Sequence, residues 1–286
     1  MDEVLKRIET HRTRMSQTQE KIATYILHQP ESIPFCTVGK LAKLTGVSEA
    51  SVVRFATFLG YKGYSDLQQD LHRKAQKQLT TVERLQLAEN VYEPAEKAIY
   101  EIFDDDIRNI QRMAETLNPK DFHQAIELIV SAKRIFIIAN RSATAMGQFL
   151  EFYLDMMLEN TELIRNPNGI SEKLFRLDEQ DLVIGLSFSR YTQSSINAVA
   201  FARDRGTPVV AITDHILSPL VPLANVALTS PSEMPSFIDS FVAPLSLINS
   251  LIVAVGREKR AQIESHLLEL EHVWDRFNIF YQKQKK

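Results

Sequence analysis

The chain has 286 residues, enough for one or two domains with a sizeable core. Hydrophobic residues make up 44% and charged residues 24%, and nine Gly and eleven Pro exclude a collagen-like or low-complexity chain. A single cysteine, Cys36, excludes an internal disulfide and a multi-cysteine zinc site, and favours the reducing cytoplasm. The first fifteen residues are charged throughout and lack the apolar segment of a signal peptide.

The net charge of −3 is unevenly distributed along the chain. Residues 1–79 contain twelve Lys or Arg and eight Asp or Glu, whereas the remaining residues contain 21 basic and 28 acidic side chains. A basic N-terminal part suits contact with a polyanion, and an acidic remainder does not. Because solvated surfaces often differ by this much, the local sequence pattern has to decide.

The N-terminal part has the apolar spacing of short helices. Gly46 suits the turn between the second and third helices, Ser48 is a good N-cap for the third, and Gly60 ends it. Ser65 is the expected cap of the fourth helix. The predicted helices cover residues 16–28, 38–44, 48–59 and about 66–77.

The second and third of these helices have the spacing of a helix-turn-helix that binds DNA. In the third helix, an apolar stripe of Val52, Phe55, Ala56 and Leu59 predicts the buried face. Its opposite face begins with short side chains, and Arg54 lies one turn further on, where a guanidinium can reach a base edge or a phosphate. The residues expected to contact DNA are Lys40, Lys43, Ser48, Glu49, Ala50, Ser51, Arg54 and Lys62. The alternative is a helical hairpin that packs only against protein.

Residues 79–106 are polar and partly helical, and we expect them to connect residues 1–78 to a second domain over 107–286. In that domain apolar β-rich runs alternate with helical segments, which indicates an α/β fold with a parallel sheet and helices on both faces. Strands are expected at 135–139, 163–164, 182–186, 209–213 and 226–228. Helices are expected at 143–158, 193–205, near 220, 236–255 and 258–281.

The apolar stretch 240–256 is uncharged, and this is the part of the chain that most resembles a membrane span. It contains Pro244 and Asn249, lies between Asp239 and Arg257, and is short for a bilayer. We therefore expect a buried helix.

A resemblance to a known family strengthens the DNA-binding interpretation. Residues 41–71, LAKLTGVSEASVVRFATFLGYKGYSDLQQDL, closely resemble the N-terminal domain of RpiR-type bacterial transcription regulators. In that family a Ser-x-x-(Ser/Thr)-Val-x-Arg-Phe recognition helix leads into Leu-Gly-Tyr-x-Gly-(Tyr/Phe). The resemblance implies an all-α helix-turn-helix domain that binds double-stranded operator DNA.

The second half of that family is a SIS domain, a doubly wound, Rossmann-like α/β unit that binds phosphosugars. Residues 181–214, DLVIGLSFSRYTQSSINAVAFARDRGTPVVAITD, resemble its strand, Ser-x-Ser-Gly-x-Thr loop, helix and next strand. Short hydroxyl side chains at a strand's carboxyl end, followed by a helix N-terminus, suit an anion. The ligand-binding residues that the resemblance implies are Asn140, Arg141, Ser142, Ser187, Ser189, Arg190 and Thr192.

Two departures from the family pattern affect this site. Arg190 replaces the loop glycine, and the Gly-x-Gly-x-Ser pattern of the first loop has become Ala139-Asn140-Arg141-Ser142. One hypothesis is that the two arginines recognise a carboxylate or phosphate bidentately. The other is that the pocket has lost its ligand and the arginines are merely solvated.

The expected function is regulation of carbohydrate metabolism by a cytoplasmic homodimer or homotetramer that senses an anionic sugar metabolite. The expected metabolite is a sugar phosphate. No cofactor, metal or enzymatic activity is expected, because Glu172, Glu233 and His215 lie in no specific catalytic motif. Two alternatives remain open. One is a sugar-phosphate isomerase with a helical appendage, and the other is a DNA-binding protein that needs no effector.

Overall fold

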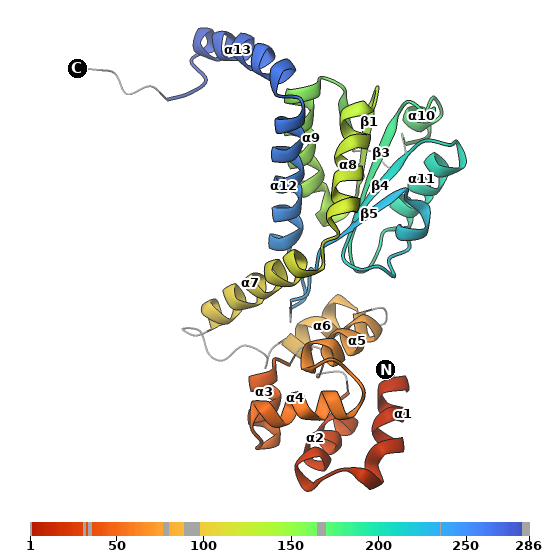
Figure 1. Cartoon of the computed structure of the whole chain (residues 1–286), viewed down its shortest axis with the longest axis vertical. Helices are drawn as coiled ribbons and strands as arrows, with labels where there is room; N and C mark the ends of the chain where they lie inside the picture. The colour runs from red at the N-terminus through yellow and green to blue at the C-terminus, as the bar shows by residue number, and fades with distance from the viewer. Residues whose placement is uncertain are drawn as a thin grey trace, which may run out of the picture. The chain divides into compact units, whose positions relative to one another are not determined.

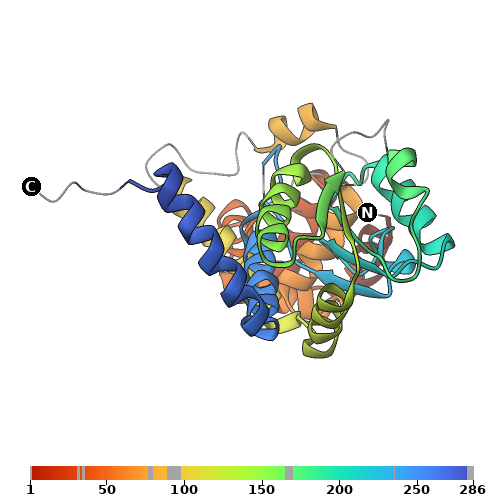
Figure 2. The same cartoon turned by 90° about the horizontal axis from the view of Figure 1, so that it is seen from above.

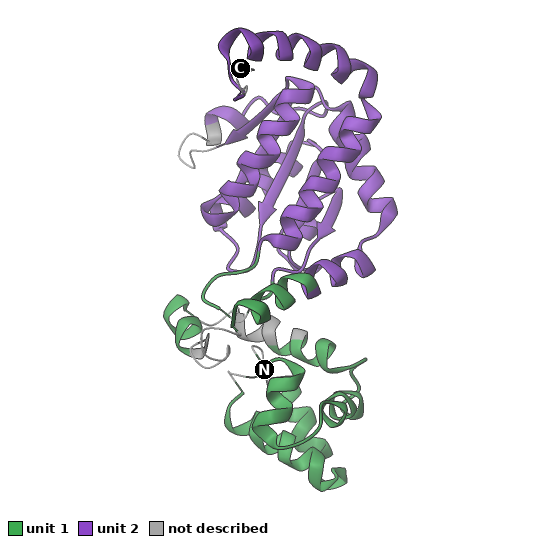
Figure 3. Cartoon of the chain, turned by 90° about the vertical axis from the view of Figure 1, so that its left-hand side faces the viewer, with its two compact units in different colours: residues 1–107, 233–240 green, residues 108–232, 241–286 purple. Residues whose placement is uncertain are grey.

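The computed structural model describes residues 2–30, 33, 36–76, 80–88, 98–164, 170–234 and 236–281. The chain forms two compact units (Figure 3). Unit 1 comprises residues 1–107 and 233–240, and unit 2 comprises residues 108–232 and 241–286. Each unit has an apolar core of its own.

Unit 1 is helical in its described residues. Its elements are α1 (Asp2–His11), η1 (Arg12–Arg14), α2 (Gln17–His28), α3 (Val38–Thr45), α4 (Glu49–Phe58), α5 (Tyr64–Gln76), α6 (Thr81–Ala88) and the first part of α7 (Ala98–Thr116). The core joins α1 to α5 and includes Ile22, Leu41, Phe55 and Leu67, none of which is exposed. The helices predicted from residue 16 to residue 59 are confirmed, with Ser16 and Ser48 as N-caps.

The fourth helix, α5, begins earlier than predicted. It starts at Tyr64, so Ser65 lies inside the helix and the prediction of Ser65 as its cap is wrong. The Tyr64 hydroxyl donates to the Cys36 carbonyl at 2.7 Å, and this tyrosine is 4% exposed. Burial of Tyr64 draws it into the first turn. The predicted end near residue 77 and part of the connector, residues 89–97, lie outside the described residues.

Unit 2 contains a five-stranded parallel sheet with the order β2-β1-β3-β4-β5. The strands are β1 (Ile135–Ala139), β2 (Thr161–Ile164), β3 (Leu182–Ser187), β4 (Val209–Thr213) and β5 (Val226–Thr229). Every residue of β1, β3 and β4 is buried, which explains why these segments are continuous apolar runs. From β1 the chain adds β2 on one side, then crosses over to add β3, β4 and β5 on the other side. The strand order therefore reverses between β1 and β3, as in a doubly wound fold.

Helices cover both faces of this sheet (Figure 1). On one face lie α8 (Pro119–Ser131), α9 (Thr144–Leu158) and α12 (Val242–Glu258), and on the other α10 (Ile170–Leu174) and α11 (Gln193–Asp204). Short 3₁₀ turns, η3 (Arg141–Ala143) and η5 (Val221–Leu223), follow β1 and precede β5. Beyond α12 the chain turns into α13 (Arg260–Phe277), which extends past α9 and α12 (Figure 2).

Two predicted helix boundaries in unit 2 are wrong. The helix predicted from residue 236 begins at Val242, because the Ile238 carbonyl accepts from Arg84 and the Ser240 hydroxyl donates to Asp106. The helix predicted to reach residue 281 ends at Phe277, where Asn278 takes the left-handed conformation with φ +49°. Among the described residues, no helix is long and apolar enough to cross a membrane. Most of the apolar stretch 240–256 forms α12, whose Leu247, Ile248 and Leu251 are buried while Val253 is exposed.

Candidate functional sites

The turn between α3 and α4 has the geometry of a tight helix-turn-helix. Gly46 takes φ +65°, which L side chains adopt only with strain, and the Val47 amide donates back to the Ala42 carbonyl at 2.9 Å. The Ser48 hydroxyl then accepts from the Ser51 amide, which starts α4. The turn therefore fixes where the first residues of α4 face.

Helix α4 has one buried and one exposed face, as predicted. Val52, Phe55 and Ala56 are fully buried in the unit 1 core. On the other face Arg54 is exposed, and its Nη2 donates to the Ser51 hydroxyl at 3.1 Å. The rest of this face comprises exposed Glu49, Ala50 and Thr57 and half-buried Ser51. This face offers short polar side chains and one guanidinium within two turns of the helix N-terminus.

The predicted lysines lie in different environments. Lys43 and Lys62 are exposed, while Lys40 is half-buried near the Cys36 thiol. Burial raises the pKa of Cys36, and the positive charge of Lys40 offsets a smaller part of that rise. The backbone amide of Lys62 donates to the Asp66 carboxylate at 3.0 Å, which holds this lysine at the start of α5. Lys43 and Lys62 are therefore better placed to meet phosphates than Lys40.

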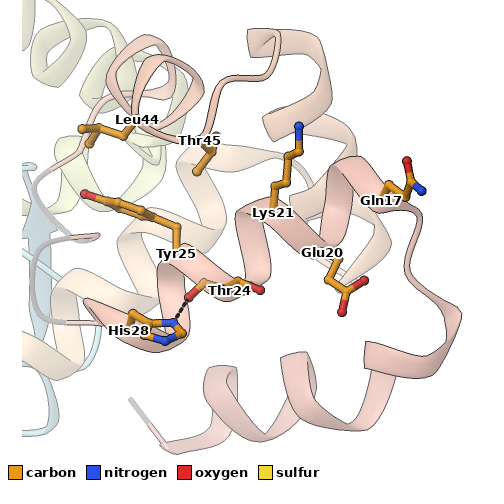
Figure 4. A pocket seen from close by; sticks show the side chains of 8 residues that line it. All are labelled: Gln17, Glu20, Lys21, Thr24, Tyr25, His28, Leu44 and Thr45. Atoms are coloured by element: carbon orange, nitrogen blue, oxygen red, sulfur yellow. Dashed lines mark hydrogen bonds between the residues drawn. The ribbon is translucent and has the colours of Figure 1, made fainter.

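A shallow groove of about 700 Å³ lies between α2 and the end of α3 (Figure 4). Its lining residues are Gln17, Glu20, Lys21, Thr24, Tyr25, His28, Leu44 and Thr45, and the His28 ring is held by the Thr24 carbonyl at 2.7 Å. The groove includes none of the residues predicted to contact DNA. With one carboxylate and one ammonium group, it has no charge excess that would attract an anion.

In unit 2, the predicted ligand residues follow β1 and β3, which are neighbours in the sheet. The carboxyl ends of these two strands form the point where the strand order reverses, and ligands of doubly wound folds bind at such points. Asn140, after β1, donates its amide to the Ser195 hydroxyl in the first turn of α11 at 2.8 Å. The two loops are therefore joined directly. Exposed Arg141 and Ser142 follow on η3.

The loop from β3 to α11 presents hydroxyl groups beside a helix N-terminus. Ser187 is 3% exposed and its hydroxyl accepts weakly from the Thr192 amide at 3.4 Å. Thr192 is the N-cap residue of α11, yet its side chain does not cap the helix, unlike those of Ser48 in α4 and Asn118 in α8. The first-turn amides and the Thr192 hydroxyl are therefore suited to an anion. Ser189, between them, is half-buried.

Helix α11 packs unusually close to β3. A Cβ atom at Gly185 would lie only 2.7 Å from Cγ2 of Val199, so a larger residue there would push the helix away. The close packing holds the N-terminus of α11 at the carboxyl end of the sheet.

The two arginines that depart from the family pattern share a backbone feature. Arg141 has φ +57° and Arg190 has φ +61°, both in the left-handed region that glycine adopts without strain. For an L-residue this conformation costs roughly 1–2 kcal/mol. The loops therefore retain a conformation that suits glycine although the residues are arginines.

Sequence reasoning missed a hydrogen-bond network behind this loop. The Tyr191 hydroxyl donates to the Asp214 carboxylate at 2.8 Å, and the Thr213 hydroxyl donates to the Ser187 carbonyl at 2.7 Å. Thr213 also contacts Ser218 at 2.7 Å. The partners come from different strand ends, so no local pattern could reveal them. The sole signal is the polar pair Thr213-Asp214 at the end of an apolar strand.

The three residues considered as catalytic candidates come from separate elements. Glu172 lies on α10, His215 follows β4, and Glu233 belongs to the segment grouped with unit 1. In the described ranges no group of three or more His, Cys, Asp or Glu side chains is arranged to hold a metal ion.

The fold and these sites define a class of protein: a helix-turn-helix unit followed by a doubly wound α/β unit with an anion-suited strand edge. Residues 2–78 match the model of the helix-turn-helix domain of the rpiR family, and residues 128–254 match the SIS domain. Together the two matches span most of the chain. The chain belongs to the RpiR family of transcription regulators.

Full-length relatives agree with this assignment. An uncharacterized HTH-type transcriptional regulator of Caldanaerobacter subterraneus is 25% identical, over 93% of this chain and 95% of the relative. The HTH-type transcriptional regulator HexR of Pseudomonas aeruginosa is 22% identical over 95% of each chain. Among solved structures, the NanR protein of Vibrio vulnificus complexed with ManNAc-6P covers 98% of this chain and 100% of its own, with 21% identity and a TM-score of 0.59. This last similarity shows a shared fold.

Proposed function

We propose that this regulator binds operator DNA through α4 and senses a sugar phosphate at the carboxyl ends of β1 and β3. The observation that supports the ligand most is the N-terminus of α11, where the Thr192 side chain makes no capping hydrogen bond and lies beside the Ser187 hydroxyl. The NanR structure, which is a complex with ManNAc-6P, shares this fold. A sugar phosphate supplies both a dianion for the amides and hydroxyls for the polar loops.

The mechanism is a shift between populations. A sugar phosphate that binds one arrangement of the two units better than another shifts the protein toward that arrangement and so changes its operator affinity. The largest possible change is set by the ratio of the sugar phosphate's affinities for the two arrangements. Regulation of transcription also implies the cytoplasm of a bacterial cell as the working compartment.

The test of the ligand site is a binding panel. Thermal shift and calorimetry with hexose, pentose and amino-sugar phosphates, with inorganic phosphate as the anion control, should yield at least one sugar phosphate that binds the full chain. Ser187→Ala and Thr192→Val should weaken it by roughly tenfold each, since hydrogen bonds to charged groups contribute about 1.5–3 kcal/mol. Ser131→Ala, on α8, removes a hydroxyl that bonds the Glu127 carbonyl in its own helix and serves as the control. No binding by any sugar phosphate would refute the proposed effector.

The proposal includes no enzymatic activity. An isomerase needs a carboxylate base and a ring-opening group positioned on one substrate, and Glu172, Glu233 and His215 lie in no sequence motif specific for such a pair. Incubation of the protein with each sugar phosphate that binds should therefore leave the sugar unchanged by NMR. Conversion of an aldose to a ketose would instead establish the isomerase alternative.

We further propose that unit 2 associates with a second copy. An apolar groove of about 490 Å³ lies among α9, α12 and α13, and Val253 and Leu268 on its lining are 62% and 59% exposed. A second copy is the occupant because helix-turn-helix regulators bind two operator half-sites as dimers, with one recognition helix in each half-site. Light scattering should show a dimer or larger at micromolar concentration, and Leu268→Glu should weaken it. A stable wild-type monomer would contradict this proposal.

A further inference from the structure

A short segment of unit 1 is flanked on both sides, in the sequence, by residues of unit 2. Residues 233–240 follow β5 and precede α12, both of which belong to unit 2, yet they group with the N-terminal helices in unit 1. The chain therefore passes from one unit to the other at 232–233 and again at 240–241, as well as at 107–108.

Three consecutive residues of this segment bind both connector helices. Nη2 of Arg84, on α6, donates to the Ile238 carbonyl at 3.0 Å and to the Asp239 carboxylate at 2.8 Å. The Ser240 hydroxyl donates to the Asp106 carboxylate, on α7, at 2.5 Å. We call this set of contacts the clasp: Arg84 and Asp106 on the helices, and Ile238, Asp239 and Ser240 on the segment.

The clasp is buried and charged. The Arg84 side chain is 3% exposed and that of Asp239 is 14% exposed, so this ion pair is shielded from water and salt. Nε of Arg84 is buried without a hydrogen-bond partner among the described residues. An apolar pair of similar volume often stabilises a fold as well as a buried ion pair does, so stability alone does not account for this one.

Local structure fixes Arg84 in place. Thr80 and Glu83 form a reciprocal cap at the start of α6: the Thr80 amide donates to the Glu83 carboxylate at 2.6 Å, and the Glu83 amide donates to the Thr80 hydroxyl at 3.2 Å. These bonds lower the pKa of Glu83. The capped first turn directs the next residue, Arg84, at the segment.

Ser230, three residues before the segment, is connected to the proposed effector site by hydrogen bonds within unit 2. The Ser187 carbonyl accepts from the Thr213 hydroxyl at 2.7 Å, and the Thr213 carbonyl accepts from the Ser230 amide at 2.8 Å. The Ser230 hydroxyl is fully buried and has no partner among the described residues. Two hydrogen bonds thus link the β3 loop to Ser230, and Ile238 follows eight positions after Ser230 in the chain.

From this arrangement we infer that the clasp transmits effector occupancy from the β3 loop to the connector helices that follow the DNA-binding helices. The inference rests on the proposed function, since it requires an effector at that loop. A bound sugar phosphate that displaces Ser230 would shift Ile238, Asp239 and Ser240 through the chain. Their contacts with Arg84 and Asp106 would then pass this shift to α6 and α7. Arg84 and Asp239 are therefore positioning residues that contact neither DNA nor effector.

The experiment measures the coupling between the two sites in the full chain. A duplex selected by the wild-type protein from a randomised pool is titrated by fluorescence anisotropy, with and without a saturating sugar phosphate from the panel. The ratio of the two Kd values is the coupling, which is typically roughly 5- to 150-fold in allosteric proteins. Calorimetry measures the sugar phosphate Kd separately.

The variants are Arg84→Met, Asp239→Asn and their double variant. Arg203→Met is the control, because Arg203 pairs with Asp204 at 2.7 Å while both side chains are about half exposed. Arg84→Met and Asp239→Asn should bring the ratio close to one, with the sugar phosphate Kd within about threefold of wild type. The double variant should add nothing beyond Arg84→Met, since Arg84→Met already removes the ion pair that Asp239→Asn disrupts. Arg84→Lys, which keeps the charge, should retain part of the coupling.

The outcomes separate the two proposals. A wild-type ratio of one, or no bound sugar phosphate, contradicts the proposed function. A wild-type ratio well above one that Arg84→Met and Asp239→Asn both preserve, in proteins with unchanged circular dichroism, overturns the clasp alone. Loss of coupling in Arg203→Met as well would mean a non-specific effect and would also overturn it.

Discussion

Replacement of Arg190 by glycine separates the strain in the β3 loop from the chemistry of its side chain. Arg190 has φ +61°, which costs an L-residue roughly 1–2 kcal/mol and costs glycine nothing. Glycine also makes the unfolded chain more flexible, which costs about 0.4–1 kcal/mol. Arg190→Gly should therefore stabilise unit 2 by up to about 1.5 kcal/mol. Arg190→Ala keeps the strain and should give no such gain.

Urea unfolding followed by the fluorescence of Trp274 measures this effect. Trp274 is the single tryptophan of the chain and lies in α13 of unit 2. The glycine variant should raise the midpoint without changing the slope of the free energy with urea. A midpoint below that of wild type would refute the interpretation of Arg190 as strained.

The same two variants test whether Arg190 binds the effector. If its guanidinium contacts the phosphate, both Arg190→Gly and Arg190→Ala should weaken the best sugar phosphate by roughly tenfold, because one charge-assisted hydrogen bond is lost. Glycine would then stabilise the fold and weaken the ligand at once. Tighter binding by the glycine variant would show that arginine obstructs the site.

Three further predictions concern other parts of the molecule. Arg54→Ala should cost about 1–3 kcal/mol of affinity for the selected operator, whereas Lys62→Ala should weaken all duplexes alike and lower the salt slope by about one in anisotropy titrations. Asp181→Ala should destabilise unit 2 by about 2–3 kcal/mol in urea unfolding: its buried carboxylate accepts two bonds from Arg134, at 2.6 and 2.8 Å, but Arg134 is 39% exposed and partly screened. Burial raises the pKa of Cys36 to about 11, so iodoacetamide at pH 8 should label the native thiol far more slowly than the unfolded one. This higher pKa of Cys36 also makes the free energy of unfolding depend on pH. Its stabilising contribution is complete below about pH 8.5, the pKa of an unfolded cysteine, and is lost as the pH rises toward 11.

Each of these predictions has a control or a contradicting result. Operator affinity unchanged in a folded Arg54→Ala protein would remove α4 as the recognition helix. Lys173→Met breaks a surface pair with Glu162 and should cost less than about 1 kcal/mol; an equal loss in both variants would contradict the special role of Asp181. Equal labelling rates for Cys36 in native and unfolded protein would contradict its burial.

Much of the fold was predictable because its signals are local. The stripe of Val52, Phe55 and Ala56 identified the buried face of α4, and continuous apolar runs identified strands buried on both faces. Ser48 was recognisable as a helix cap because a cap acts on an amide within three residues of it.

The features that escaped prediction depend on distant partners. The start of α12 moved to Val242 because Ile238 and Ser240 bond to Arg84 and Asp106, more than 130 residues earlier in the chain. Burial of Tyr64 against Cys36, 28 residues away, likewise moved the start of α5. Sequence patterns report neighbours along the chain and contain no information on such pairs.

The ligand site was partly predictable. Resemblance to a family supplied Ser187 and Thr192, and the structure shows that their loop and the loop after β1 follow neighbouring strands and are joined by the hydrogen bond from Asn140 to Ser195. It could not supply the backbone of Arg190, since an arginine is expected at negative φ. The family's glycine at that position was the available signal, because glycine commonly marks a left-handed backbone.

The most direct test of the central claim is the operator affinity of the wild-type protein with and without sugar phosphate. Anisotropy of the selected duplex, at fixed salt, should show sequence-specific binding whose Kd changes at least fivefold when a sugar phosphate that binds is saturating. Inorganic phosphate at the same concentration should change it far less. Specific DNA binding that no sugar phosphate alters would contradict the account and leave a DNA-binding protein that needs no effector.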